Sequence, residues 1–235
     1  WMHIRVGQFE RAAEALTRCR RLYTRLQRAP LPYMGTDPAT PLAIVALING
    51  RHERAVILAE DARRSAEERH DNHNLAFAHY ALTAARSAQG DYDVAYTHAE
   101  KACQLSHALG NDWFLPYALN EWGKVCRAVG NLDEARRHFR SSDELKEAFE
   151  DREGMAVALN HLAEIDFLRG DYANARQLYQ QALALYQDLN DRGGLATSLE
   201  GLAQVAAAQG DDLNARQQFA RALRIATQIE YWPLV

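Results

Sequence analysis

Apolar positions along this sequence recur at the spacing of an α-helix, and glycine interrupts them at regular intervals. In residues 151–190, one apolar face is marked by Leu159, Leu162, Ala163 and Ile165, and a second by Ala175, Tyr179 and Ala182. Spacings of three and four residues place side chains on one face of a helix. Gly170 stands between the two faces. The pattern therefore predicts two helices joined by a turn at this glycine.

The same arrangement repeats along the chain. Glycine recurs every forty residues, at Gly90, Gly130, Gly170 and Gly210. Five residues after each glycine comes an alanine, at Ala95, Ala135, Ala175 and Ala215. Segments 151–190 and 191–230 are identical at 15 of 40 positions. We therefore predict a forty-residue repeat in which each unit is one pair of helices.

The residues beside each glycine fit a turn between helices. A helix commonly ends in the left-handed conformation, which glycine adopts without steric cost. Asp171 follows Gly170 and is suited to cap the next helix, and Asp91, Asn131 and Asp211 occupy the equivalent places. The first helices have their own predicted N-caps, at Asp71, Asn111, Asp151 and Asp191.

Composition narrows the class of protein. The 235 residues are 48% hydrophobic and 25% charged, with a formal net charge of −4, so we expect a folded chain without the basic surface of a nucleic-acid binder. Cys19, Cys103 and Cys126 are widely spaced within helical segments, which favours buried thiols in a reducing cytosol. No apolar stretch has the length of a membrane span. We expect a cytoplasmic protein with no direct contact to nucleic acid or membrane.

The repeat resembles the tetratricopeptide repeat (TPR). The matching residues in one unit are Leu162-Ala163, Gly170-Asp171-Tyr172, Ala175, Tyr179 and Ala182, and in the preceding unit Trp122-Gly123, Gly130-Asn131, Ala135 and Phe139. The resemblance implies an all-α, right-handed superhelical solenoid of antiparallel helix pairs. HEAT and armadillo repeats also have periods near forty, but they lack the Gly-Asp-x-x-x-Ala pattern.

We expect one solenoid over residues 1–235. Its predicted divisions are a partial repeat at 1–29, a proline-rich loop at 30–40, repeats at 41–70, 71–110, 111–150, 151–190 and 191–230, and the start of a further helix at 231–235. The proline-rich segment is interpreted as a loop because the repeat continues in phase on both sides. Helical patterns at both ends suggest a piece of a longer polypeptide.

A narrower resemblance suggests a signalling role. The Gly35-Thr36-Asp37-Pro38 segment, Leu42-Ala43 and Arg54-Ala55 after Gly50 resemble the repeat region of bacterial signal-transduction ATPases with numerous domains (STAND), which include LuxR-type and cyclase-linked regulators. In that family such a region is the sensor arm beside a nucleotide-binding switch. The resemblance implies a partner protein, peptide or small-molecule inducer, and an adjoining nucleotide-binding domain. The alternative is an interaction scaffold that does not switch.

A candidate binding groove follows if the first helices line the concave face, as in TPR proteins generally. Spacings of three and four then select Phe77, Tyr80, Tyr117, Asn120, Lys124, Arg127, Asn160, Glu164, Phe167, Glu200 and Gln204. Leu119-Asn120 and Leu159-Asn160 resemble the Leu-Asn pairs of peptide-binding TPR proteins such as kinesin light chain. An amide both donates and accepts hydrogen bonds, which suits a peptide backbone. The alternative is that both asparagines are solvated helix residues.

Charged residues within the pattern raise further hypotheses. Lys124 and Arg127, one helical turn apart, could hold a carboxylate or phosphate, or be neutralised by Glu121 and Glu164. Asp166 occupies an apolar position of the repeat. It could be buried beside Arg127 or Arg176, or it could turn to solvent.

We expect no enzyme, cofactor or metal. The sequence has no P-loop, no Gly-x-Ser-x-Gly and no Cys-x-x-Cys. His70 and His73 are close in sequence, but no ligand set completes a metal site around them, so a loop role is favoured. A remote alternative is an enzyme that uses Glu121, Glu164 and Glu200 as acid and base.

Overall fold

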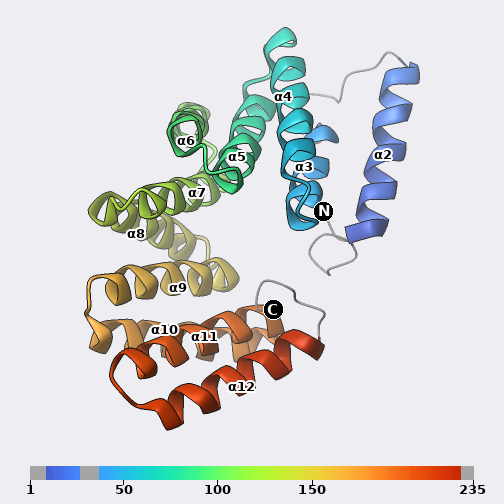
Figure 1. Cartoon of the computed structure of the whole chain (residues 1–235). Coiled ribbons are helices and arrows are strands. Elements are labelled where there is room, and N and C mark those ends of the chain that lie inside the picture. The colour runs from blue at the N-terminus through green and yellow to red at the C-terminus, as the bar shows by residue number, and fades with distance from the viewer. Residues whose placement is uncertain (1–8, 27–36, 229–235) are drawn as a thin grey trace. The chain divides into compact units, whose positions relative to one another are not determined.

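The computed structural model describes residues 9–26 and 37–228, and all regular structure within these ranges is α-helical. The helices are α2 (Phe9–Leu26), α3 (Ala39–Ile48), α4 (His52–Glu68), α5 (Asn72–Ala88), α6 (Tyr92–Ala108), α7 (Leu115–Ala128), α8 (Leu132–Ala148), α9 (Arg152–Leu168), α10 (Tyr172–Leu189), α11 (Arg192–Ala208) and α12 (Asp212–Gln228). They form two compact units (Figure 1): unit 1, residues 1–130, holds α2 to α7, and unit 2, residues 131–235, holds α8 to α12.

The helix boundaries follow the predicted repeat. Each repeat from 41–70 to 191–230 contains two helices with the expected glycine between them. One boundary was wrong: the proline-rich loop was predicted to reach residue 40, but α3 already begins at Ala39. The Gly7 turn, residues 30–36 and the expected helix at 231–235 lie outside the described residues.

The turns have the predicted backbone conformation. Gly170 has φ +79° between α9 and α10, and Gly50, Gly90, Gly130 and Gly210 are also positive. Three of the second helices are followed instead by a non-glycine residue in this region: His70, Glu150 and Asn190 have φ values of 53° to 54°. The equivalent residue of the remaining internal repeat is Gly110. A left-handed conformation is costly for residues that carry a Cβ atom.

Most of the predicted helix caps are present. Asp71, Asp151 and Asp191 each accept a hydrogen bond from the backbone N–H three residues ahead, at the start of α5, α9 and α11. Asn111 also accepts from the N–H of Phe114, but α7 begins later, at Leu115, with Phe114 as its N-cap residue. Asp91 makes no side-chain cap and instead pairs with Arg86.

Unit 1 is built on small residues at its helix crossings. Leu42, Leu58 and Leu82 form a core with alanines that are fully or almost fully buried, contributed by α3, α4 and α5. Leu16 of α2 packs against the same core. Alanine at a crossing lets two helix axes approach closely, so the chain can alternate close contacts with leucine-filled layers.

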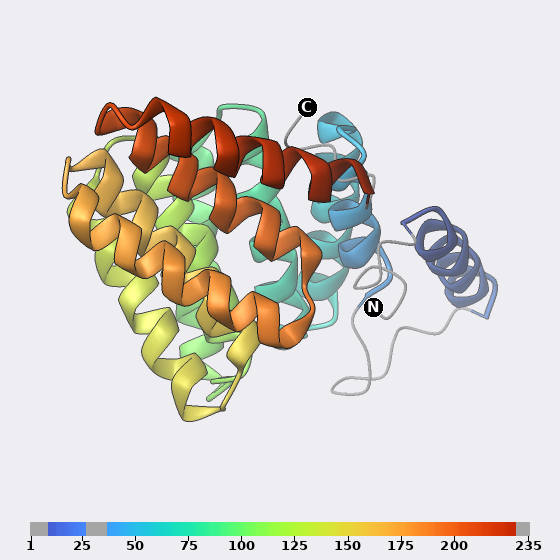
Figure 2. The same ribbon diagram turned by 90° about the horizontal axis from the view of Figure 1, so that it is seen from below.

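Unit 2 also has small residues where its helices cross. Consecutive helices pack on one another, and the two first helices, α9 and α11, are also in contact. Ala163 and Ala175 are completely buried where α9 crosses α10. The orange to red ribbons of Figure 2 show these helices side by side. The expected all-α fold of helix pairs is therefore confirmed.

Candidate functional site

A cavity of about 470 Å³ lies in unit 2, between α9, α10 and α11. α9 contributes Val157, Asn160, His161 and Glu164 to its lining. α11 contributes residues at the same helical spacing, and Tyr179 and Tyr186 of α10 close it from another side. Since cavities of a few hundred Å³ are the usual size of small-ligand sites, the volume is sufficient for binding.

Four residues of the predicted groove line this cavity: Asn160, Glu164, Glu200 and Gln204. They come from the first helices of two successive repeats, as the spacing of three and four required. The structure therefore brings this part of the predicted stripe together. That the stripe binds a partner stays a prediction.

Close packing between α10 and α11 shapes the cavity. A Cβ atom at Gly201 would overlap the ring of Tyr179, and a Cβ atom at Gly194 would overlap the ring of Tyr186. Both pairs are separated by seven residues along their helices, so the two contacts lie two turns apart. Glycine at these positions lets the tyrosine rings lie against the backbone of α11, where they are almost fully buried.

The lining is negatively charged. Glu164, Glu200 and Asp191 carry carboxylates, and no lysine or arginine is among the described residues that line the cavity. Burial raises the pKa of Glu200 above its ordinary value, because the partly desolvated carboxylate is less stable in its charged form. The Glu200 side chain accepts a long hydrogen bond of 3.4 Å from the Gln204 amide.

Asn160 has a structural contact as well as a place in the cavity. It is 8% exposed, and its Oδ1 lies 2.9 Å from the Ser198 hydroxyl on α11. The same hydroxyl lies 3.0 Å from the carbonyl of Gly194. A hydroxyl carries one proton, so Ser198 donates to one of these acceptors at a time. The Asn160 amide therefore links α9 to α11, and Asn160 is not the solvated residue of the alternative hypothesis.

Phe167 does not belong to this cavity. Its ring packs against Tyr172 across the turn between α9 and α10, with centroids 5.7 Å apart. It also borders the core around Tyr179. Its predicted place in the groove is therefore taken up by packing inside the helix pair.

The predicted aromatic residues of unit 1 pack around the start of α7. Phe77 and Tyr80 of α5 contact the ring of Phe114, with centroids 4.1 and 5.4 Å apart. Tyr117 contacts Trp113 at 5.6 Å. Burial of the Tyr80 hydroxyl, with Glu121 nearby, raises the pKa of Tyr80 above its ordinary range. The contacts of Phe77 and Tyr80 with Phe114 therefore connect α5 to the start of α7.

The polar residues of unit 1 are less suited to hold an anion than the spacing suggested. Lys124 Nζ lies 2.7 Å from Glu121 Oε1, so its charge is neutralised on the same helix. Arg127 is partly buried on the next turn of α7. Asn120 is 5% exposed, and its Oδ1 is buried without a hydrogen-bond partner among the described residues. Asn120, like Asn160, is therefore a buried residue.

Asp166 has a different partner from those predicted. It is 2% exposed and forms an ion pair with Arg136 of α8, instead of with Arg127 or Arg176. Arg176 donates to Gln209, the C-cap residue of α11. The hypothesis that Asp166 is buried beside an arginine was therefore correct. The arginines named for it were wrong, because its actual partner, Arg136, lies on the second helix of the preceding repeat.

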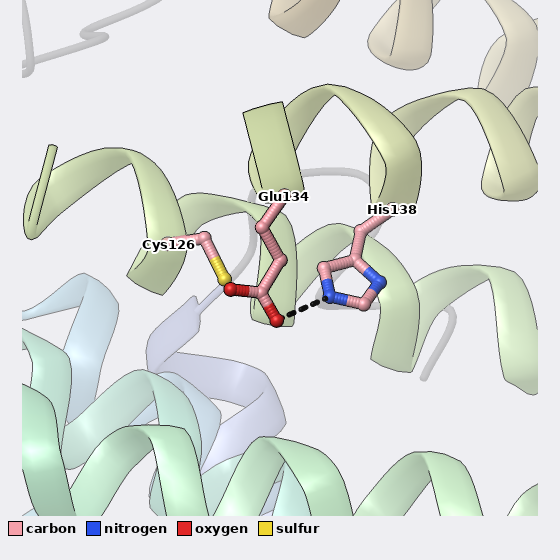
Figure 3. A group of neighbouring side chains, drawn as sticks. All are labelled: Cys126, Glu134 and His138. Carbon is pink, nitrogen blue, oxygen red and sulfur yellow. Dashed lines mark ion pairs between the residues drawn. The ribbon is translucent and has the colours of Figure 1, made fainter. Parts of the chain in front are cut away.

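Histidines pair across helices. His79 Nδ1 lies 2.9 Å from His98 Nδ1 in unit 1, while His73 is in the first turn of α5 and His70 ends the preceding helix pair. The pKa of His79 is lowered to about 3, mainly by burial and in smaller part by His98 and the cations Lys101 and Arg63. In unit 2, His138 Nε2 lies 3.6 Å from Glu134 Oε1 on the same helix (Figure 3). The third residue drawn there, Cys126, belongs to α7 of unit 1.

Several cavity residues were not predicted as site residues. Tyr179 was assigned to the core and Asp191 to a helix cap, and Tyr186 and His161 were not selected. A signal was available: Gly194 and Gly201 are seven residues apart, as are Tyr186 and Tyr179. Matching a pair of glycines on one helix to a pair of large residues on the preceding one indicates close contact.

Comparison with known proteins agrees with this geometry. The model of the tetratricopeptide repeat family matches residues 115–188 and 154–228. This chain contains tetratricopeptide repeats. The TPR fold is a protein-interaction fold and typically serves as a non-enzymatic scaffold. No curated protein matches the sequence.

Solved structures show that the fold extends beyond the matched repeats. BtubC (BKLC) from P. vanneervenii is similar with a TM-score of 0.71 and 20% identity, over 95% of this chain and 93% of that one. A STAND protein with a tetratricopeptide repeat sensor, PH0952 from Pyrococcus horikoshii, has a TM-score of 0.70 and 15% identity, over 99% of this chain and 35% of that one. A Rap protein complexed with Competence and Sporulation Factor has a TM-score of 0.74 and 14% identity, over 84% and 56%.

The structure also bears on the membrane and cysteine predictions. Among residues 9–26 and 37–228, no helix has the length and apolar character needed to span a membrane. Cys103 and Cys126 are buried and Cys19 is partly buried, and none of the three is in a disulfide. Burial raises the pKa of Cys103 to about 12, so this thiol stays protonated.

Proposed function

We propose that this TPR chain binds a protein or peptide segment along the first helices of its repeats, with the cavity of unit 2 as a principal contact. The observation that carries this proposal is the cavity itself, because four residues selected by helical spacing are among those that line a volume of about 470 Å³. The Asn160 amide stands at the edge of a network with Ser198, where it can exchange a hydrogen bond with a peptide backbone. The volume also suits a small-molecule inducer.

We further propose that binding is sensed by a larger bacterial regulator of the STAND type, through an adjoining nucleotide-binding domain. The similarity of fold to PH0952, a STAND protein with a tetratricopeptide repeat sensor, supports this, as does the similarity to a Rap protein complexed with Competence and Sporulation Factor. A ligand held between α9 and α11 would favour one relative orientation of two successive repeats. Stacked repeats contact only their neighbours, so small rotations add along the array.

Selection from a display library of random peptides tests the binding proposal. Thr197 is an exposed cavity residue, so Thr197→Trp should obstruct the cavity and remove binding of the selected peptides. Gln187→Trp is the matched control, since Gln187 is exposed on α10 and does not line the cavity. Failure to select any peptide, or equal binding by both variants, would contradict the proposal.

Asn160 needs a control of its own because of its contact with Ser198. Asn160→Ala removes the amide, while Ser198→Ala removes only the hydroxyl between the two helices. We expect Asn160→Ala to weaken peptide binding more than Ser198→Ala does. Equal losses would assign Asn160 to helix packing.

An assay on the proposed full-length regulator distinguishes the sensor hypothesis from the scaffold hypothesis. In the longer polypeptide, a selected peptide should change the rate of ATP hydrolysis by the adjoining domain if the TPR region is a sensor. An unchanged rate at saturating peptide would favour the scaffold that binds without switching.

A further inference from the structure

We infer that the outer face of α12 docks a further helix of the same kind as α9 and α11, through a copy of the contacts that α8 and α10 make with those helices. α12 lies at the edge of unit 2, beyond α10 and α11 (Figure 1). It contributes no residue to the described lining of the cavity. The docking face is therefore separate from the proposed peptide site, and each can be tested without the other.

An aromatic residue recurs at one position of the second helices of unit 2, and the next first helix covers it in two of the three repeats. Phe139 of α8 is completely buried and stacks on His161 of α9, with ring centroids 4.7 Å apart. Forty residues later, Tyr179 of α10 is 4% exposed and lies against Gly201 of α11. Forty residues later again, Phe219 of α12 is 43% exposed. Within the described chain, no first helix follows α12 to cover this ring.

An arginine recurs three residues before each of these aromatic residues. Arg136 of α8 forms its ion pair with Asp166 of α9, and Arg176 of α10 donates to Gln209 at the end of α11. Both arginines therefore reach the next first helix. Arg216 of α12 is exposed, and its side chain has no hydrogen bond or ion pair with any residue in 9–26 or 37–228. α12 thus carries the ring and the cation of this contact without the helix that they meet in the two preceding repeats.

Further apolar side chains extend the same face of α12. Leu223, one turn after Phe219, is 49% exposed, and Leu213 is 71% exposed. Helical spacing places all three on one side of the helix, with Arg216 among them. Exposed apolar side chains grouped on one face mark an interaction surface. Because Arg216 has no partner among the described residues, charge complementarity favours a helix that brings a carboxylate or an amide oxygen to it.

The two covered repeats define the chemistry of the docked helix. The residue opposite the aromatic ring is flat or small, namely His161 on α9 and Gly201 on α11. The group that accepts from the arginine follows five residues later at Asp166 and eight residues later at Gln209. We therefore expect a helix with a small residue opposite Phe219 and an oxygen acceptor five to eight residues further along.

A second contact of each pair adds specificity, because α12 differs there from the preceding second helix. Tyr186 of α10 lies against Gly194 of α11, where an added Cβ atom would overlap the tyrosine ring. The equivalent residue of α12 is the much smaller Ala226. A helix docked on α12 should therefore accept a large residue at the position of Gly194, although α10 excludes one.

A synthetic peptide with the sequence of residues 191–209 is the probe, because it carries the groups that meet Tyr179 and Arg176. Fluorescence anisotropy should show that the labelled peptide binds the full chain. Gly201→Leu in the peptide should weaken binding about tenfold or more, since leucine would overlap the Phe219 ring. Gly194→Leu is the matched control and should keep the affinity within about twofold, because it would face Ala226. Both substitutions raise helix propensity equally, so their difference reports the contact.

Variants of the chain assign the binding to α12. Phe219→Gln should weaken binding of the unmodified peptide about tenfold, and Arg216→Glu about threefold. The Gln209→Lys peptide should bind the Arg216→Glu chain more tightly than the unmodified chain. Arg221→Glu makes the same charge change on another exposed side of α12 and should leave the affinity within about twofold. Circular dichroism melts establish that each variant is folded.

Each alternative outcome contradicts the docking face in its own way. Equal binding to the unmodified chain and to Phe219→Gln would place the peptide elsewhere. Loss of binding with both glycine substitutions would show that the peptide displaces α11 from α10. Dimerisation of the chain alone in sedimentation velocity, abolished by Phe219→Gln, would assign the face to a second copy. Absence of peptide binding would overturn the docking face and leave the proposed function of the cavity untouched.

Discussion

Asp166 of α9 is buried against Arg136 of α8, although the residues forty positions before and after it are Cys126 and Ala206. The second carboxylate oxygen, Oδ2, has no hydrogen-bond partner among the described residues. The free-energy cost of burying a charge depends strongly on whether an oppositely charged partner lies beside it. This pair is therefore a feature of one repeat and not of the repeat pattern.

Loss of Arg136 should destabilise unit 2 strongly. Arg136→Met leaves the Asp166 carboxylate without its cation, and we expect the free energy of unfolding to fall by about 2–4 kcal/mol. Asp166→Ala, which restores the residue found in the following repeat, should recover most of the loss when combined with Arg136→Met. Urea denaturation measures both. Equal stability of the single and double variants would contradict the predicted role of the pair.

The contrast between the turns and this ion pair shows what the sequence could predict. The position of Gly170 and its equivalents defined every helix pair of the internal repeats, because glycine adopts the left-handed turn without steric cost and recurs at this place in each of them. The partner of Asp166 depends on how two helices from different repeats are set against each other. Spacing along one helix holds no information on that arrangement.

Only part of the candidate site was predicted, again because spacing along one helix does not give the arrangement between helices. Asn160, Glu164, Glu200 and Gln204 were found because helical spacing places them on one face of the first helices. Tyr179 and Tyr186 serve both the core and the cavity, and periodicity assigns a side chain to only one of these. Phe167 fulfilled the spacing but turned to Tyr172, since an aromatic ring gains more from burial than from solvent.

Gly201 and Gly193 should respond in opposite directions to alanine. A methyl group at Gly201 would overlap the Tyr179 ring, and we expect a net loss of about 1–2 kcal/mol after the gain in helix propensity is included. At Gly193 the nearest atom is Asp191 Oδ1 at 3.4 Å, so Gly193→Ala should stabilise the chain by about 0.5 kcal/mol. Thermal unfolding of the two variants decides this. A stabilising Gly201→Ala would show that Tyr179 moves aside freely.

Glu150 follows the C-cap residue of α8 and has the left-handed conformation, with φ 54°, where the preceding repeat has Gly110. Glu150→Gly should raise the free energy of unfolding by about 1 kcal/mol because glycine adopts this conformation without strain. Glu144→Gly is the control: it places glycine inside the same helix and should lower stability by about 1 kcal/mol. Destabilisation by both variants in chemical denaturation would show that Glu150 contributes more than its backbone conformation costs.

The His79–His98 pair should make unit 1 less stable at acid pH. Burial lowers the pKa of His79 from 6.5 to about 3 and also lowers that of His98, so the folded chain binds fewer protons than the unfolded chain below pH 6.5. The stability that the neutral pair contributes is complete above pH 6.5 and is lost as the pH falls towards 3, at up to about 1.4 kcal/mol per pH unit for each histidine. Arg63 and Lys101 favour the neutral form of both rings, whereas Glu60 favours the protonated form of His98.

The window between pH 6.5 and 5 isolates this effect, because most carboxylates remain ionised there. Unfolding measured across this window should show a steep loss of stability in the unmodified chain and a shallower one in His79→Gln. His107→Gln, at an exposed position of α6, should keep the original slope. A slope in His79→Gln equal to that of the unmodified chain would place the acid sensitivity outside the histidine pair. Since His79 and His98 join α5 to α6 within one repeat, the loss should appear first in the hydrogen exchange of these two helices.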